Sequence, residues 1–312
     1  MNLLKENLTL IVLLIGILFS MMSGVLFSST GLFFEPYLLV WLGIILYVNL
    51  IQLNPNDLKK AFINPKKIII LSITKLLIIP IFMFIILFIF EPELALPIVL
   101  LSGISTGLGA PFVINFIGGK LSEIIGIITI TSILVTFTLP FMIFLLFQEE
   151  FNIPIMDMII ILVLAQFLPL ILGWLTKKFV PNVKEIINKF STIISFIFII
   201  LINFTMFAIF SDYFFQDISF VITNIIIASM LFTVYGLIGY FVVITINRKK
   251  EITKEDKITG FTSMAYINNI IIAVFALEFF SIEVAALAVF YNIPYYFGIL
   301  ILKKIYSMKN YK

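Results

Sequence analysis

Lys75 is a basic residue deep inside a long apolar stretch, residues 68–90, where no other basic residue occurs. A charged group in such a position is costly, so it is a functional-site hypothesis by default. An ammonium group there could attract an anionic substrate or take part in proton coupling. The alternative is snorkelling, because Lys75 lies seven residues past Ile68, about 10 Å deep at 1.5 Å per residue.

A second group of chemically useful residues interrupts the stretch LSGISTGLGAPFVINFIGGK, residues 101–120, which has Gly103, Gly107, Gly109 and Pro111 near its middle. Proline removes a backbone donor and clashes with the preceding helical turn. In lipid, the freed backbone groups need partners, so such a break is expected where it lines a cavity or packs inside protein. Close helix packing through small residues is the alternative.

A third group lies in ITGFTSMAYINNIIIAV, residues 258–274, with polar side chains at Thr262, Ser263, Asn268 and Asn269. These residues could bind a substrate or an ion, or they could form a hydrogen-bonded clamp between helices. Paired broken or polar helices at matching places in two halves of a chain are typical of secondary transporters.

The composition decides which elements must position these residues. Of the 312 residues, 62% are hydrophobic and 12% are charged, which excludes a soluble globular domain and disorder. The chain has no cysteine and no histidine, which excludes thiolate catalysis, Ser-His-Asp triads and cysteine or histidine metal sites. The sequence therefore predicts an all-α polytopic membrane protein.

A membrane-spanning helix needs about 20 apolar residues. Ten stretches fit, and we predict ten transmembrane helices in a single domain, residues 1–312, with the helices at 8–27, 37–53, 68–90, 94–118, 122–147, 155–176, 186–210, 218–246, 258–279 and 283–303. The interrupted stretches are the fourth and the ninth. Since they are five helices apart, they predict an inverted repeat, about 1–147 and about 155–303.

The basic residues indicate the orientation. The N-terminus, the even connections and the C-terminal tail carry 19 of the 20 lysines and arginines, and the odd connections carry acidic residues instead. By the positive-inside rule, both termini are cytoplasmic, in a multi-pass protein of the plasma membrane. The basic loops are explained by topology and by contact with lipid headgroups, and no nucleic-acid partner is expected.

Several segments resemble the bile acid:sodium symporter family, within the superfamily that includes arsenite and auxin carriers. INPKKIIILSITKLLIIP resembles the family's third helix, GAPFVINFIGGKLSEIIGIITITSILVTFTLP its fourth and fifth, and FLPLILGWLTKKF its sixth. INNIIIAVFAL lies where the family has its crossover signature, and AALAVF through Gly298 resembles the tenth helix. The resemblance implies a core of helices 3–5 and 8–10, a panel of helices 1, 2, 6 and 7, and crossing of helices 4 and 9.

Departures from the family pattern bear on sodium coupling. The family's glutamate before the crossover aligns with Met264, and a sodium-binding glutamine of the third helix aligns with Lys75. The resemblance also aligns the Ser-Asn pair of the fourth helix with Ala110 and Pro111, and the polar pair of the tenth with Pro294 and Tyr295. The candidate substrate and ion site is therefore Lys75, Thr106, Gly107, Gly109, Pro111, Asn115, Thr129, Thr131, Ser132, Thr262, Ser263, Asn268, Asn269 and Tyr295.

The sequence thus predicts a secondary transporter of a small organic anion, with sodium coupling weakened or lost and no cofactor. Coupling to sodium or to protons stays open.

An auxin-carrier-like permease is the first alternative, with Asn115 as its characteristic asparagine near the break. Because the chain has no cysteine, the arsenite branch, which uses a thiol, is disfavoured. An intramembrane enzyme lacks a nucleophile and base at depth, since Glu123, Asp157, Glu278 and Glu283 lie at helix ends, where solvation is expected. A receptor would need no broken helices.

Overall fold

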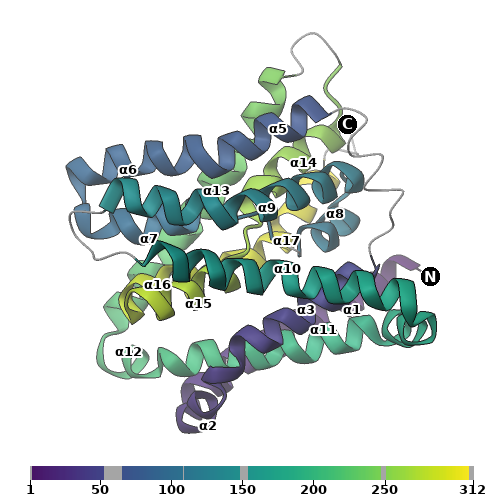
Figure 1. Cartoon of the computed structure of the whole chain (residues 1–312), viewed down its shortest axis with the longest axis horizontal. Helices are drawn as coiled ribbons and strands as arrows, with labels where there is room; N and C mark the ends of the chain where they lie inside the picture. The colour runs from purple at the N-terminus through teal and green to yellow at the C-terminus, as the bar shows by residue number, and fades with distance from the viewer. Residues whose placement is uncertain (1, 53–64, 108, 148–153, 247–250, 309–312) are drawn as a thin grey trace. The chain divides into compact units, whose positions relative to one another are not determined.

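A computed structural model describes residues 2–52, 65–107, 109–147, 154–246 and 251–308, and nearly all of them are helical (Figure 1). Each of the ten predicted stretches carries helix. Some residues used above to predict the topology lie outside the described part of the chain: Lys59, Lys60, Glu149, Glu150, Arg248, Lys249, Lys250, Lys309 and Lys312.

Six described helices are long and apolar enough to cross a membrane, by length and composition. They are Pro65–Phe90, Leu121–Phe147, Ile155–Phe179, Pro181–Ile209, Ile218–Ile246 and Ile282–Tyr306. Shorter apolar helices occur at Ile11–Leu26, Glu35–Asn49, Pro92–Ser102 and Asn269–Phe279. The chain is a multi-pass membrane protein; the tenfold crossing and the inverted repeat stay predictions.

The chain divides into two compact units, Met1–Gln52 with Leu164–Thr223, and Leu53–Val163 with Asn224–Lys312. Unit 1 contains α1 (Asn2–Leu26), α2 (Ser28–Phe33), η1 (Glu35–Tyr37), α3 (Leu38–Gln52), most of α10 (Ile155–Phe179), α11 (Pro181–Ile209), α12 (Ser211–Gln216) and the start of α13 (Ile218–Ile246). In this unit α11 packs against α1 and α3. A Cβ added at Gly24 of α1 would collide with the Phe204 carbonyl of α11, so glycine permits this close approach.

Unit 2 contains the rest of α10 and α13 and the helices that hold the candidate residues. Its first segment has α5 (Pro65–Ile73), the π-helical turn η2 (Thr74–Ile78), α6 (Ile79–Phe90), α7 (Pro92–Ser102), α8 (Ala110–Ile117) and α9 (Leu121–Phe147). Its second segment has α14 (Lys254–Ala265), α15 (Asn269–Phe279), α16 (Ile282–Phe290) and α17 (Asn292–Met308).

Local sequence explains several helix ends in unit 2. Prolines occupy the first turns of α5, α7 and α8, where a missing N–H costs nothing. Thr253 caps α14 through a capping box with Asp256. Gly118 ends α8 with a φ of 87°, a conformation that disfavours other residues.

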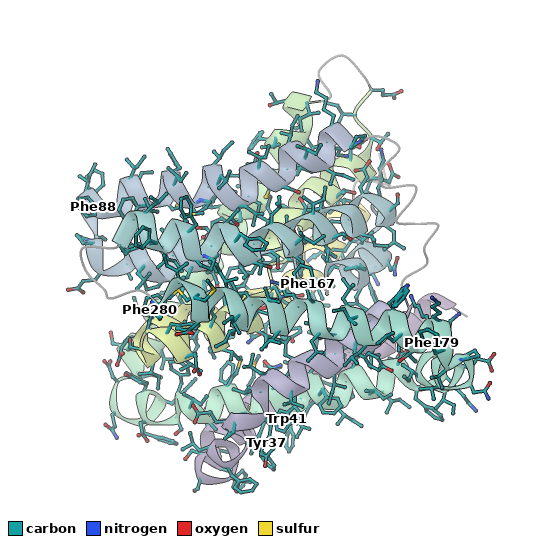
Figure 2. All side chains as sticks on the ribbon, in the orientation of Figure 1. Tyr37, Trp41, Phe88, Phe167, Phe179 and Phe280 are labelled. Atoms are coloured by element: carbon teal, nitrogen blue, oxygen red, sulfur yellow. The ribbon has the colours of Figure 1, made fainter. Side chains whose placement is uncertain are left out.

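The exterior of the helices is apolar, as a lipid environment requires. Large hydrophobic side chains project from most helices, among them the labelled Tyr37 and Phe88 (Figure 2), which are 48% and 56% exposed. Polar side chains are concentrated inside unit 2 instead. Thr106, Thr131, Thr262 and Ser263 are fully buried.

Candidate functional site

Both predicted interruptions are present, and they meet each other. The first separates α7, which ends at Ser102, from α8, which begins at Ala110. The second separates α14, which ends at Ala265, from α15, which begins at Asn269. An antiparallel bridge joins Thr106 to Ile267. We call residues 103–107, 109 and 266–268 the crossover.

Two backbone hydrogen bonds form the bridge. The Gly107 N–H donates to the Tyr266 carbonyl at 2.8 Å, and the Asn268 N–H donates to the Ser105 carbonyl at 3.0 Å. A Cβ at Gly107 would collide with the carbonyl of Ile267, so the close approach requires glycine. The bridge gives partners to backbone groups that the helix breaks leave exposed, which lipid could not do.

The C-terminal carbonyls of α14 are bonded by side chains from other segments of the chain. The Thr106 hydroxyl donates to the Ser263 carbonyl at 2.8 Å. The Lys75 ammonium donates to the Met264 carbonyl at 3.0 Å, and the Tyr291 hydroxyl donates to the Ala265 carbonyl at 2.7 Å. A helix leaves its last four carbonyls without intrahelical partners. Here side chains supply partners for three consecutive carbonyls.

Lys75 is 1% exposed and lies in the π-helical turn η2, which displaces it from regular α-helical spacing. Its ammonium is directed at the negative end of the α14 dipole, which favours a cation. Within the described part of the chain it has no carboxylate partner. The side chain therefore reaches the C-terminal end of α14 beside the crossover, and the snorkelling alternative does not describe this conformation.

Helix α9 contributes Thr131 to the crossover. Its hydroxyl accepts from the Thr106 N–H at 3.2 Å and donates to the Ile127 carbonyl at 2.7 Å. The other two predicted residues of this helix are not bonded to the crossover: Thr129 donates to the Ile125 carbonyl, and Ser132 is half-buried. The threonine spacing alone could not decide which of these hydroxyls faces the interruption.

Further predicted residues border the crossover. Gly109 approaches Tyr295 so closely that a Cβ would collide with the tyrosine hydroxyl, and Pro111 lies in the first turn of α8. Thr262 is fully buried, and its hydroxyl has no hydrogen-bond partner among the described residues. Asn115, in contrast, is exposed on α8.

The asparagines after the second interruption differ in their contacts. Asn268 occupies the N-cap position of α15 and is 8% exposed. The Asn269 amide donates to the Asn292 side-chain oxygen at 2.9 Å. Asn292 was not among the predicted residues. It is 1% exposed, and its amide nitrogen has no partner in the described chain. Its signal was an amide side chain two positions before Pro294, inside residues 284–302, where no charged residue occurs.

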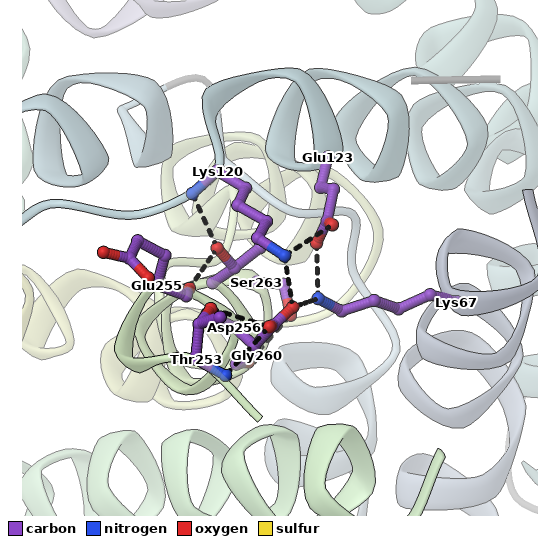
Figure 3. A network of polar contacts seen from close by, with 9 residues as sticks. Lys67, Lys120, Glu123, Thr253, Glu255, Asp256, Gly260 and Ser263 are labelled. Carbon is purple, nitrogen blue, oxygen red and sulfur yellow. Dashed lines mark hydrogen bonds and ion pairs between the residues drawn. The ribbon is translucent and has the colours of Figure 1, made fainter. Parts of the chain in front are cut away.

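A second polar group, absent from the predictions, lies at the N-terminal ends of α5, α9 and α14 (Figure 3). Lys67 contacts Glu123 at 2.5 Å and Asp256 at 2.6 Å. Lys120 contacts Asp256 at 2.8 Å and Glu123 at 3.8 Å. We call these four residues the ion cluster. Glu123, which was expected to be solvated at a helix end, instead takes part in this partly buried network.

The ion cluster is electrically balanced. Burial alone would raise the pKa of Asp256, but hydrogen bonds from Lys120, Lys67 and Thr253 outweigh it and hold that pKa well below its usual range. Burial alone would lower the pKa of Lys120, but the hydrogen bond to Asp256 and the nearby carboxylates raise it. Asp256 is therefore ionised at neutral pH.

The geometry can be compared with known proteins. A family model, that of the sodium bile acid symporter family, matches residues 39–217 of the chain. The match begins in α3 and ends just after α12, so it covers α7, α8 and α9 with the first interruption. A search of curated proteins found no match.

Proposed function

Since the chain belongs to the sodium bile acid symporter family, and is thus a membrane transporter and not an enzyme, we propose that it moves a small organic anion by alternating access. The single observation that carries this proposal is the bridge between two interrupted helices, with an ammonium group held beside it. Secondary transporters build substrate sites from discontinuous helices of this kind.

The anionic character of the substrate follows from the charges at the crossover. Lys75 brings a buried cation without a carboxylate partner among the described residues. Helices α8 and α15 both begin at the crossover, and helix N-termini favour negative charge. An anion bound there would compensate the ammonium charge, which is costly to leave unpaired in a low-dielectric interior.

We further propose that Lys75 takes the place of a sodium ion. A hard cation needs several oxygen ligands, but the Met264 carbonyl is occupied by the lysine and the Ser263 carbonyl by Thr106. A sodium ion a few Å from the ammonium would also be repelled, by about 4 kcal/mol at 4 Å and an effective dielectric of 20. Transport is therefore expected to be largely independent of sodium.

Unit 2 is proposed as the core and unit 1 as the moving panel of the transporter. Unit 2 contains the crossover, while unit 1 contains helices of the first, second, sixth and seventh predicted spans. The inverted repeat, about 1–147 and about 155–303, is part of this proposal. Its support is that the interruptions fall in the fourth and ninth predicted helices.

The proposed location is the plasma membrane, with both termini in the cytoplasm. Lys67, Lys120 and Asp256 come from the ends of three different even connections, yet they meet in one cluster. Their meeting supports placing these connections on one side of the membrane, and the positive-inside rule makes that side cytoplasmic.

The auxin-carrier-like alternative depends on an asparagine at the break in the fourth helix. Asn115 is exposed on α8, and no hydrogen bond joins it to the crossover among the described residues, so no observation favours this alternative.

The test is uptake by proteoliposomes of a panel of labelled monocarboxylates and sterol acids, with sodium, and with sodium replaced by choline. The proposal expects saturable uptake of at least one anion over protein-free liposomes, at similar rates in both buffers. The absence of saturable uptake for every anion of the panel would contradict the anion proposal, and uptake abolished when choline replaces sodium would contradict the proposal for Lys75.

A further inference from the structure

Three helices of unit 2 connect the ion cluster to the crossover with equal spacing. In each helix, a residue of the cluster is followed eight residues later by a residue that bonds at the crossover or at the end of α14 beside it. The pairs are Lys67 and Lys75 on the segment of α5 and η2, Glu123 and Thr131 on α9, and Asp256 and Met264 on α14.

The contacts at the two ends are matched. Lys67 bonds to Asp256 at 2.6 Å, and Lys75 bonds to the Met264 carbonyl at 3.0 Å, so both lysines reach from the same segment to α14 across the same sequence separation. Lys67 also bonds to Glu123 of α9 at 2.5 Å (Figure 3). It therefore ties both α9 and α14 to α5.

Equal spacing makes the cluster a fixed reference for the crossover. Eight residues of α-helix rise by about 12 Å. Between Lys67 and Lys75, residues 67–73 are α-helical, and only Thr74 and Lys75 lie in the π-helical turn η2. If three helices are fixed together at one end, residues at equal distances along them remain level at the other. A shift of α14 along its axis would instead move the Met264 carbonyl away from Lys75.

We propose that Lys67, Glu123 and Asp256 are positioning residues that set the axial register of α5, α9 and α14, and thereby place Lys75, Thr131 and the Met264 carbonyl at the crossover. This inference rests on the proposed function only in taking the crossover as the transport site. Lys120 has a lesser part, since its side chain is 37% exposed and it lies before the start of α9.

Because the chain has no native cysteine, a pair of introduced cysteines can measure the register directly. Thr106 and Ile267 face each other as a non-hydrogen-bonded antiparallel pair, whose Cα atoms lie about 4.5 Å apart. This separation suits a disulfide. In the double variant Thr106→Cys with Ile267→Cys, the rate of oxidative cross-linking reports how often the two segments are level, without any substrate.

Asp256→Asn in the double-cysteine background is expected to slow cross-linking about tenfold, because displacements of about 1 Å strongly reduce intramolecular reactivity. The variants Asp256→Glu and Lys67→Arg keep the charges, so each should cross-link at nearly the rate of the double-cysteine protein without further changes. Lys66→Gln is the matched control, because Lys66 is exposed on the same helix and should leave the rate unchanged. Transport is measured in parallel in the cysteine-free variants, where Asp256→Asn should lose uptake that Asp256→Glu recovers.

Gel filtration in detergent shows whether each variant is folded and monodisperse. If Asp256→Asn is not, Glu123→Gln replaces it, because this change removes the other carboxylate that bonds to Lys67, and cross-linking should slow about twofold to threefold. Unchanged cross-linking in a folded Asp256→Asn or Glu123→Gln protein would overturn the proposal, even if transport fell. If Asp256→Asn slows cross-linking but the unmodified protein transports no anion, the proposed function is contradicted. The positioning role is then still supported.

Discussion

Lys67 and Lys75 lie eight residues apart on one helical segment, and both are buried, at 7% and 1% exposure. Their surroundings are different. Lys67 lies between the carboxylates of Glu123 and Asp256, whereas Lys75 meets only a backbone carbonyl within the described chain. The same residue type on the same helix is thus compensated by full charges at one end and by a helix dipole at the other.

This difference separates a structural charge from a charge available to a ligand. A buried ion pair is satisfied within the protein, and removing either partner is costly. An ammonium held by one carbonyl still has N–H donors and a net charge to offer. We therefore propose that Lys67 positions the helices and that Lys75 binds the substrate, and the predictions below test this difference.

The largest effect is expected for Lys75→Gln. This variant removes the cation but retains a polar group that can donate to the Met264 carbonyl. Sodium-independent uptake in proteoliposomes should fall at least about tenfold, since a charged hydrogen bond is worth roughly 1.5–3 kcal/mol. Sodium should restore part of the uptake, because the repulsion between the ammonium and a metal cation is gone.

Lys66→Gln is the control for that measurement, since Lys66 is exposed on the same segment. If Lys75→Ala transports like the unmodified protein while omission of sodium abolishes uptake in both, Lys75 is not a substitute for sodium.

Asp256→Asn tests the compensated end of the segment. The change leaves Lys67 buried with a single carboxylate, and breaking a buried pair costs about 3–5 kcal/mol. The unfolding temperature in detergent should fall by several degrees, while Lys66→Gln should change it little. An unchanged unfolding temperature would mean that the cluster adds little stability.

Gly107→Ala tests the close approach between the two interruptions. The new Cβ would meet the backbone of Ile267, which cannot move aside as a flexible side chain could, so a loss of about 1–3 kcal/mol and of transport is expected. Gly43→Ala is the matched control, because its Cβ would have ordinary contact with Pro169 at 3.8 Å. Thermal unfolding of both variants measures the difference, and equal unfolding temperatures would show that the crossover tolerates a side chain.

The crossover and the ion cluster also differed in how well the sequence predicted them. Both helix interruptions could be predicted, because the glycines, the proline and the polar residues that cause them are local in sequence. Lys75 could be singled out from the sequence by its place in an apolar stretch, and its role in transport stays a prediction. Its contact with Met264 could not be predicted, since this depends on the reach of a side chain across 189 residues.

The ion cluster was missed for a similar reason. Lys67 and Lys120 were taken as topological charges, and Glu123 as a solvated helix end. Each of these readings is reasonable for a residue considered alone. Only the folded structure brings the ends of α5, α9 and α14 close enough for these charges to meet.

The smallest effect concerns pH, and it tests whether compensation at the cluster is electrostatic. In the folded protein the pKa of Asp256 lies below its ordinary value. Burial alone would raise this pKa, but the hydrogen bonds from Lys120 and Lys67 lower it by more. A carboxylate of this kind adds stability above its unfolded pKa, about 3.9, and loses it as the pH falls toward the folded pKa. The contribution of Asp256 to the unfolding temperature in detergent should therefore be constant from about pH 8 to 5. Below about pH 4 the unfolding temperature should decline by a few degrees. Asp256→Asn removes the titrating group, so its unfolding temperature should start lower and decline less over the same acid range. Parallel declines in both proteins would assign the acid sensitivity to other carboxylates and would leave Asp256 without an electrostatic role.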